Sequence, residues 1–218
     1  MEQIADVGNG NYAYVDGLAE ARKVLVNEMS STLFTIAQDV KVQIEFNPAK
    51  VAEYRLIGFE NRILKREDFN NDKVDAGDIG AGHTVTALYE IVPAGGRGSI
   101  DPLRYGKTGT ATVSPDAAEF AFLKLRYKLP GQDRSRLIEK PLAASLLGGS
   151  NVAKPSADLR FAAAVAAFGQ ILRGGRHTGD FDYGDVLELA RDARGDDPFG
   201  YRAGFLTLVD LARGLQGS

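Results

Sequence analysis

The chain has 218 residues, of which 44% are hydrophobic and 25% are charged, and its formal net charge is −3. This composition is typical of a globular protein with one large domain or two small ones. No dense run of lysine and arginine is interleaved with aromatic residues, which argues against nucleic-acid binding. No apolar run reaches the length of about 20 residues that a membrane-spanning helix needs. Cysteine is absent and the two histidines are isolated, which excludes disulfides, thiolate chemistry and a zinc site of the usual His/Cys type.

The first segment predicts one strand and one helix. Tyr12 to Val15 is a short strand-like run, and the acids Asp16 and Glu20 then stand where a helix N-terminus favours negative charge. Apolar residues follow at helical spacing, namely Leu18, Ala21, Leu25 and Met29. Met1 leads directly into polar residues without the pattern of a signal peptide, so we expect the chain to be the cut end of a longer one.

The middle of the chain predicts an antiparallel β-sandwich over residues 31–145. In VKVQIEF the apolar residues from Val40 to Phe46 alternate with polar ones, which indicates a strand with Lys41 on its wet face. Further strands are predicted over residues 53–59, 84–92, 108–113, 123–129 and 135–140. Gly and Pro punctuation, with no intervening helix, favours antiparallel pairing.

After the linker LLGGSNVAKPS, three short helices are predicted over residues 146–218. Ser156 and Asp182 can cap the first two, and Asp197 followed by Pro198 opens the third. The expected inward stripes are Phe161, Val165, Phe168 and Leu172; Val186, Leu189, Ala190 and Ala193; and Tyr201, Phe205, Leu208 and Ala212. The predicted fold class is therefore mixed α and β, an antiparallel β-sandwich followed by a small three-helix C-terminal subdomain. We expect the helices to dock on the sandwich with Phe168 at the centre of the contact.

The stretch with the most candidate ligand side chains is REDFNNDKVDAGDIGAGHTV. An EF-hand calcium loop beginning at Asp68 would place Asn70 and Asp72 at the third and fifth positions. Lys73 then replaces the glycine of the sharp turn, and Ile79 replaces the final carboxylate. We interpret the stretch as a solvated connection whose Asp and Asn side chains bond their own backbone, with a weak, irregular calcium site as the alternative.

Three other features are weak candidates. The GKT at 106–108 matches the end of a phosphate loop, but Asp101 replaces its first glycine and a strand follows instead of a helix. His83 could act as a base together with a carboxylate such as Asp78, yet no nucleophile accompanies it. We interpret His83 and His177 as surface residues.

A basic row alternates along one predicted strand, formed by Lys124, Arg126 and Lys128. Most rows of this kind are the solvated side of a sheet, and a patch for a partner is the alternative.

Three runs resemble a known family: GNGNYAYVDGLAEARKVLVNE, VKVQIEFNPAKVAEYRLIGFENR and EDFNNDKVDAGDIGAGHTVTALYEIVP. They resemble bacterial proteins in which a von Willebrand factor type A domain precedes a C-terminal region of unknown function. The resemblance implies that residues 1–30 are a remnant of the last strand and helix of the type A domain. That domain binds a divalent metal through an Asp-x-Ser-x-Ser motif, which does not occur in these 218 residues. The metal site therefore cannot be assigned to any residue here.

The sequence thus predicts a non-catalytic accessory or interaction module of a cell-envelope protein, with a protein partner. No catalytic, cofactor-binding or metal-ligating residue is assigned. The alternative is a hydrolase or carbohydrate-active domain with a site near the loop from Asp68 to His83. Residues 1–30, left without their sheet, are expected to fold back on the sandwich or to mediate contact between chains.

Overall fold

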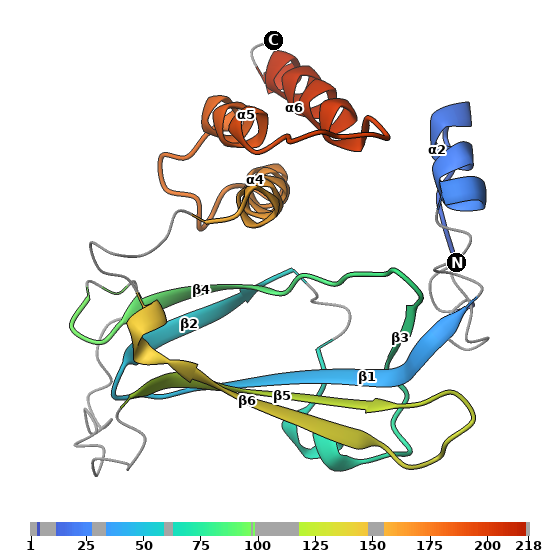
Figure 1. Ribbon diagram of the computed structural model, residues 1–218. Coiled ribbons are helices and arrows are strands. Elements are labelled where there is room, and N and C mark those ends of the chain that lie inside the picture. The colour runs from blue at the N-terminus through green and yellow to red at the C-terminus, as the bar shows by residue number, and fades with distance from the viewer. Residues whose placement is uncertain are drawn as a thin grey trace. The chain divides into compact units, whose positions relative to one another are not determined.

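The computed structural model describes residues 4, 12–27, 34–58, 63–96, 98, 118–147 and 155–216 (Figure 1). The strands are β1 (Thr35–Phe46), β2 (Val51–Ile57), β3 (Gly77–Gly80), β4 (Leu88–Pro93), β5 (Glu119–Lys128) and β6 (Arg136–Ala143). The α-helices are α2 (Leu18–Arg22), α4 (Ala157–Leu172), α5 (Tyr183–Asp192) and α6 (Tyr201–Gln216). The predicted fold class is confirmed, because β-sheets with antiparallel pairing precede a group of three helices.

The strands form two sheets. One has the order β3-β1-β5-β6 with antiparallel pairing throughout, and the other pairs β2 with β4. β1 begins at Thr35, five residues before the predicted start, and β6 pairs back on β5 as expected. The strand predicted over 84–92 starts only at Leu88, and β3 was not predicted. The strand predicted over 108–113 lies outside the described residues.

The chain divides into two compact units. The first contains the four-stranded sheet, and the second contains α4, α5 and α6 together with residues 54–58 and 86–91. Arg55 of β2 forms an ion pair with Glu90 of β4 and donates a hydrogen bond of 3.3 Å to Gln170 of α4. The predicted boundary near residue 145 assigned every strand to one domain, whereas parts of β2 and β4 share a unit with the helices.

The predicted strand at Tyr12–Val15 is wrong, because residues 12–16 have no regular secondary structure. A strand is stable only beside a partner, and no strand among the described residues pairs with this run. The helix after it is confirmed as α2, continued by one π-helical turn, Lys23–Asn27. Leu18 is 88% exposed and Leu25 is 68% exposed, so the apolar face of this helix is largely uncovered.

Phe168 lies at the centre of the three-helix core. Its ring makes edge contacts with Tyr183 of α5 and Phe205 of α6, with centroids 5.9 and 5.5 Å apart. Phe161 makes a further edge contact with Phe205 at 5.3 Å. The buried residues around Phe168 are Ala164, Tyr183, Val186, Leu187, Ala190 and Val209. Phe168 is therefore buried among the three helices, whereas Tyr201 remains 40% exposed, and the expectation that the helices cannot bury all of these rings among themselves stays a prediction.

The predicted helix caps are largely confirmed. Ser156 Oγ accepts a hydrogen bond from Leu159 N, and Asp182 forms a capping box with Asp185. The third helix begins at Tyr201 instead of at Pro198. Asp197 nevertheless caps it, because its carboxylate accepts hydrogen bonds from the backbone N–H groups of the second and third helical residues.

Two of the predicted inward stripes are partly wrong. On α4, Val165 and Leu172 are exposed, although Phe168 between them is buried. On α6, Leu208 is 53% exposed, whereas Val209 beside it is fully buried. The reason is that α6 carries apolar residues on two faces, and periodicity alone does not decide which face packs on α4 and α5.

Candidate functional site

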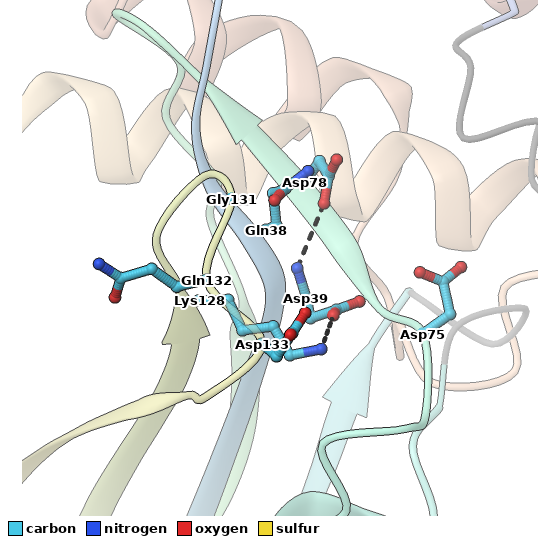
Figure 2. Close-up of a pocket in the computed structure, with 8 residues that line it drawn as sticks. All are labelled: Gln38, Asp39, Asp75, Asp78, Lys128, Gly131, Gln132 and Asp133. Carbon is cyan, nitrogen blue, oxygen red and sulfur yellow. Dashed lines mark hydrogen bonds and ion pairs between the residues drawn. The ribbon is translucent and has the colours of Figure 1, made fainter.

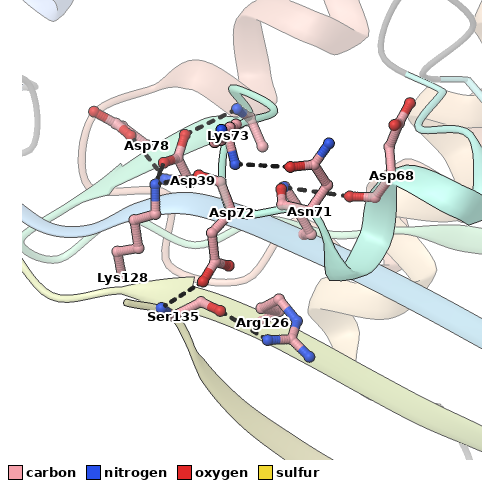
Figure 3. A network of polar contacts seen from close by, with 11 residues as sticks. Asp39, Asp68, Asn71, Asp72, Lys73, Asp78, Arg126, Lys128 and Ser135 are labelled. Atoms are coloured by element: carbon pink, nitrogen blue, oxygen red, sulfur yellow. Dashed lines mark hydrogen bonds and ion pairs between the residues drawn. The ribbon is translucent and has the colours of Figure 1, made fainter. Parts of the chain in front are cut away.

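The acidic loop between β2 and β3 lies against the four-stranded sheet (Figure 3). A 3₁₀ turn, Arg66–Asn70, carries Phe69, which is only 3% exposed. The guanidinium of Arg126 lies 5.6 Å from the centre of the Phe69 ring. The loop is therefore anchored by one aromatic side chain and is not simply a solvated connection.

Lys41 is the buried cation beneath the loop. Its side chain lies on β1 at 3% exposure, and Nζ donates to the carbonyl oxygens of Asn71 at 2.5 Å and Asp68 at 3.4 Å. Hydrogen bonds of this kind offset the cost of removing an ammonium group from water. The prediction that Lys41 lies on the wet face is wrong, and its neighbour Val42 is instead 48% exposed. The loop covers the face of β1 that the alternation marked as polar.

The basic row of β5 also holds the loop. Arg126 donates to Asn70 Oδ1 at 2.9 Å and to Ser135 Oγ at 2.7 Å. Lys128 donates to the carbonyl oxygen of Asp72 at 2.7 Å. The interpretation of this row as a solvated face is therefore wrong for these two residues, while Lys124 lies over the Phe122 ring.

Asp39 is the centre of the polar network on β1. It occupies an irregularity in the register of β1 with both neighbouring strands, and its φ of +51° is a conformation that aspartate tolerates better than most residues. Its Oδ2 accepts from Lys128 Nζ at 2.6 Å and its Oδ1 from Ala76 N at 3.1 Å. Its own N–H donates to Asp78 Oδ1 at 3.2 Å. The bulge thus turns one residue of β1 toward the loop and the start of β3.

These contacts shift the pKa values of the network. Partial burial acts to raise the pKa of Asp39, but hydrogen bonds from Lys128 and from the Ala76 backbone outweigh it and hold that pKa below its usual value. The hydrogen bond to Asp39 raises the pKa of Lys128. Hydrogen bonding to Ser135 lowers the pKa of Asp72. Asp39 and Asp72 are therefore carboxylates at neutral pH and are poorly suited to donate a proton as general acids.

A polar cavity of about 220 Å³ adjoins this network (Figure 2). Its lining residues are Gln38, Asp39, Asp75, Asp78, Lys128, Gly131, Gln132 and Asp133. Asp39 and Lys128 are paired with each other at its wall, and Asp78 accepts the hydrogen bond from the Asp39 backbone. The cavity gathers four carboxylates around one ammonium group.

The candidate calcium ligands contact different partners and not one common point. Asn70 binds Arg126, Asp72 Oδ2 accepts a hydrogen bond of 3.3 Å from Ser135 N, and the Asp68 carbonyl faces Lys41. Among the residues that the structure describes, no group of three or more His, Cys, Asp or Glu side chains is arranged to hold a metal ion. Of these candidate ligands, Asn70 accepts a hydrogen bond from Arg126 through its side-chain oxygen, whereas the two lysines of the sheet contact backbone carbonyl oxygens of the loop.

The remaining predicted candidates are scattered. His83 is exposed after β3, and Asp78 accepts a hydrogen bond from the Asp39 backbone N–H. His177 is exposed between α4 and α5. The GKT at 106–108 lies outside the described residues.

Sequence reasoning missed Lys41 and Asp39, the two β1 residues that hold the loop. Of the two, Asp39 gives a weak local signal, because it is an acidic residue directly before the predicted strand. Their partners are 27 to 89 residues away in the sequence, so no local pattern names them.

The sequence matches the family model described as "Uncharacterized protein YfbK, C-terminal" over residues 31–215. It is 51% identical over 215 residues to "Uncharacterized protein YfbK" of Escherichia coli strain K12, across 99% of this chain and 36% of that protein. The chain thus spans about a third of the length of this curated relative. No solved structure matches the chain. Neither the description of the family nor that of the relative mentions a type A domain, so that part of the resemblance stays a prediction. In the described part of the chain, no helix has the length and apolarity to cross a membrane.

Proposed function

Because the chain belongs to the family of YfbK C-terminal regions, we propose that it is a non-catalytic accessory module that binds a protein partner. The parent is proposed to be a cell-envelope protein with a von Willebrand factor type A domain. The single observation that carries this proposal is that the acidic loop is bound to the sheet through backbone carbonyl groups and the Asn70 side chain. Lys41, Arg126 and Lys128 each contact loop oxygen atoms, so their charges stabilise the fold.

An exposed apolar row on the sheet supports a binding role. Val42 of β1 pairs with Leu125 of β5, and Leu125 pairs with Ile138 of β6, so the three side chains form a row across three strands. Val42 is 48% exposed and Ile138 is 52% exposed. Apolar side chains that remain open on a folded sheet favour contact with another protein.

The proposal is tested in the full-length parent, expressed in its own cells and cross-linked before purification. Deleting residues 31–218 should remove specific cross-linked partners, and Ile138→Glu should weaken the same cross-links. Leu137→Glu is the matched control, because Leu137 is 42% exposed and adjacent side chains of a strand point to opposite faces. Identical cross-linked partners with and without the region would contradict the proposal.

A hydrolase or carbohydrate-active domain is the second candidate, and the polar cavity favours it. Asp75, Asp78 and Asp133 lie in its lining together with the Asp39–Lys128 pair. Hydrolysis of a panel of glycoside and ester substrates, lost on Asp78→Asn with the fold intact, would favour this candidate over the binding module.

A further inference from the structure

The loop from Asp68 to Asp72 turns backbone carbonyl groups toward the sheet. The carbonyl oxygens of Asn71 and Asp68 accept hydrogen bonds from Lys41 Nζ at 2.5 and 3.4 Å, and that of Asp72 accepts one from Lys128 Nζ at 2.7 Å. A carbonyl oxygen is an acceptor with two lone pairs, and converging carbonyl groups are common ligands of cations in proteins. The cations bound here are ammonium groups of the chain itself.

The register of the sheet shows why these oxygen atoms are needed. Lys41 of β1 stands directly opposite Arg126 of β5. Like charges at directly opposite positions of neighbouring strands destabilise a sheet. The loop supplies an acceptor to each of them, because Lys41 bonds to the two carbonyl groups and Arg126 donates to Asn70 Oδ1 at 2.9 Å. The loop oxygen atoms therefore offset the repulsion between two cations on one face of the sheet.

The Lys41 site suits an ammonium group better than a metal ion. The side chain of Lys41 is 3% exposed, so a cation bound there gives up nearly all of its water. Its Nζ contacts two carbonyl oxygens, whereas calcium takes about six to eight oxygen ligands. An ammonium group instead needs acceptors only for its N–H donors, and these carbonyl groups accept from them directly. The number and type of the ligands thus select a primary ammonium group.

We propose that the carbonyl groups of Asp68 and Asn71 form an ammonium-binding site that Lys41 occupies from within the chain, and that this site binds a free primary ammonium ion when the lysine side chain is removed. The atoms that Lys41→Ala removes beyond Cβ are those of n-propylammonium, which is therefore the matching ligand. The proposal goes beyond the binding module and does not depend on it, because it concerns the face of the sheet under the loop and not the exposed apolar row.

Urea unfolding of Lys41→Ala in two salts tests the site. One sample contains n-propylammonium chloride, and the other contains tetramethylammonium chloride at the same concentration, which has the same charge but no N–H donor. For a ligand of so few atoms we expect a dissociation constant on the order of 10–100 mM. At about 0.2 M, n-propylammonium should then raise the ratio of folded to unfolded Lys41→Ala by about 3- to 20-fold over the other salt. The unsubstituted chain should not distinguish the two salts, because Lys41 already fills the site.

Two further variants are the controls. Lys73→Ala removes a lysine from an exposed position of the same loop and should not distinguish the salts. Lys41→Met removes the charge but fills the space of the lysine stem, so n-propylammonium should not stabilise it. Equal stability of Lys41→Ala in the two salts, or an equal gain by Lys73→Ala, would overturn the proposal.

The intact chain gives a second measurement, which decides the occupancy of the site even if Lys41→Ala folds in neither salt. Nuclear magnetic resonance of the lysine ammonium groups should show slow proton exchange with water for Lys41, because its Nζ is buried and bonded to carbonyl groups. The exposed Lys73 should exchange rapidly. Equally rapid exchange at Lys41 would overturn the proposal.

Discussion

Lys128 and Asp39 form an ion pair of 2.6 Å between β5 and the bulge in β1. The two side chains are 15% and 18% exposed, and Lys128 also binds the Asp72 carbonyl of the acidic loop. The pair therefore helps to join the sheet to the acidic loop singled out from the sequence.

This pair predicts a dependence of stability on pH. The folded pKa of Asp39 is below 3.8, so its contribution is present above that value and is lost as the pH falls through the folded pKa. The folded pKa of Lys128 is above 10.5, so its contribution is present below that value and is lost as the pH rises through the folded pKa. Asp39→Asn should lower the free energy of unfolding at pH 7 by about 1–2 kcal/mol and reduce its loss as the pH falls below about 4. Urea unfolding across this range measures the effect, and parallel pH profiles for the two proteins would contradict it.

Replacing Lys41 by Met should destabilise the protein. Methionine can fill the space of the lysine stem, but the Asn71 and Asp68 carbonyls lose a buried donor. We expect a loss of about 1–3 kcal/mol in the free energy of unfolding, measured by chemical denaturation. Lys73→Met removes the same charge from an exposed position on the loop and should have little effect. Equal effects of the two substitutions would show that Lys41 does not hold the loop.

Phe168→Ala should remove the centre of the three-helix core. A buried phenylalanine replaced by alanine costs about 3–5 kcal/mol, a large part of a total stability of about 5–15 kcal/mol. We predict that calorimetry shows one shared unfolding transition and that this substitution lowers its temperature. Phe199→Ala is the control, because Phe199 is 63% exposed. Two transitions, of which only one moves, would show that the helices unfold independently.

Deleting residues 1–30 should leave the main thermal transition largely intact. The exposed apolar side chains of this segment, including Tyr14 at 82% and Leu18 at 88%, contribute little buried surface. Differential scanning calorimetry of the shortened chain checks this. A loss of cooperative unfolding would mean that the segment belongs to the core.

The fold was largely predictable because its signals are local. Alternation identified β1 and β5, a turn signal identified β6, and the capping residues Ser156 and Asp182 identified the starts of two helices. The face of each element was less predictable, because facing depends on distant segments. The alternation of β1 predicts that Lys41 is exposed to solvent. It is instead buried, because a loop 27 residues onward covers it.

For the candidate site, the sequence predicted the position in the chain but not the contacts that its residues make. The acidic stretch was singled out, and the expectation that its side chains bond their own backbone holds for Asn71, which accepts a hydrogen bond from a backbone N–H of the loop, but not for Asn70 and Asp72. Arg126 and Lys128, read as a solvated row, in fact bind the loop across 56 residues of sequence. Hydrogen bonds of this kind depend on strand register, which the sequence pattern does not determine.

The central claim is that Lys41, Arg126 and Lys128 hold the acidic loop to the sheet, and we predict that the loop for this reason binds no calcium. Isothermal titration with calcium tests it most directly, because calcium would compete for the oxygen atoms that these cations contact. The account predicts no saturable binding at micromolar calcium. A saturable site in that range that is lost in Asp72→Ala would contradict it.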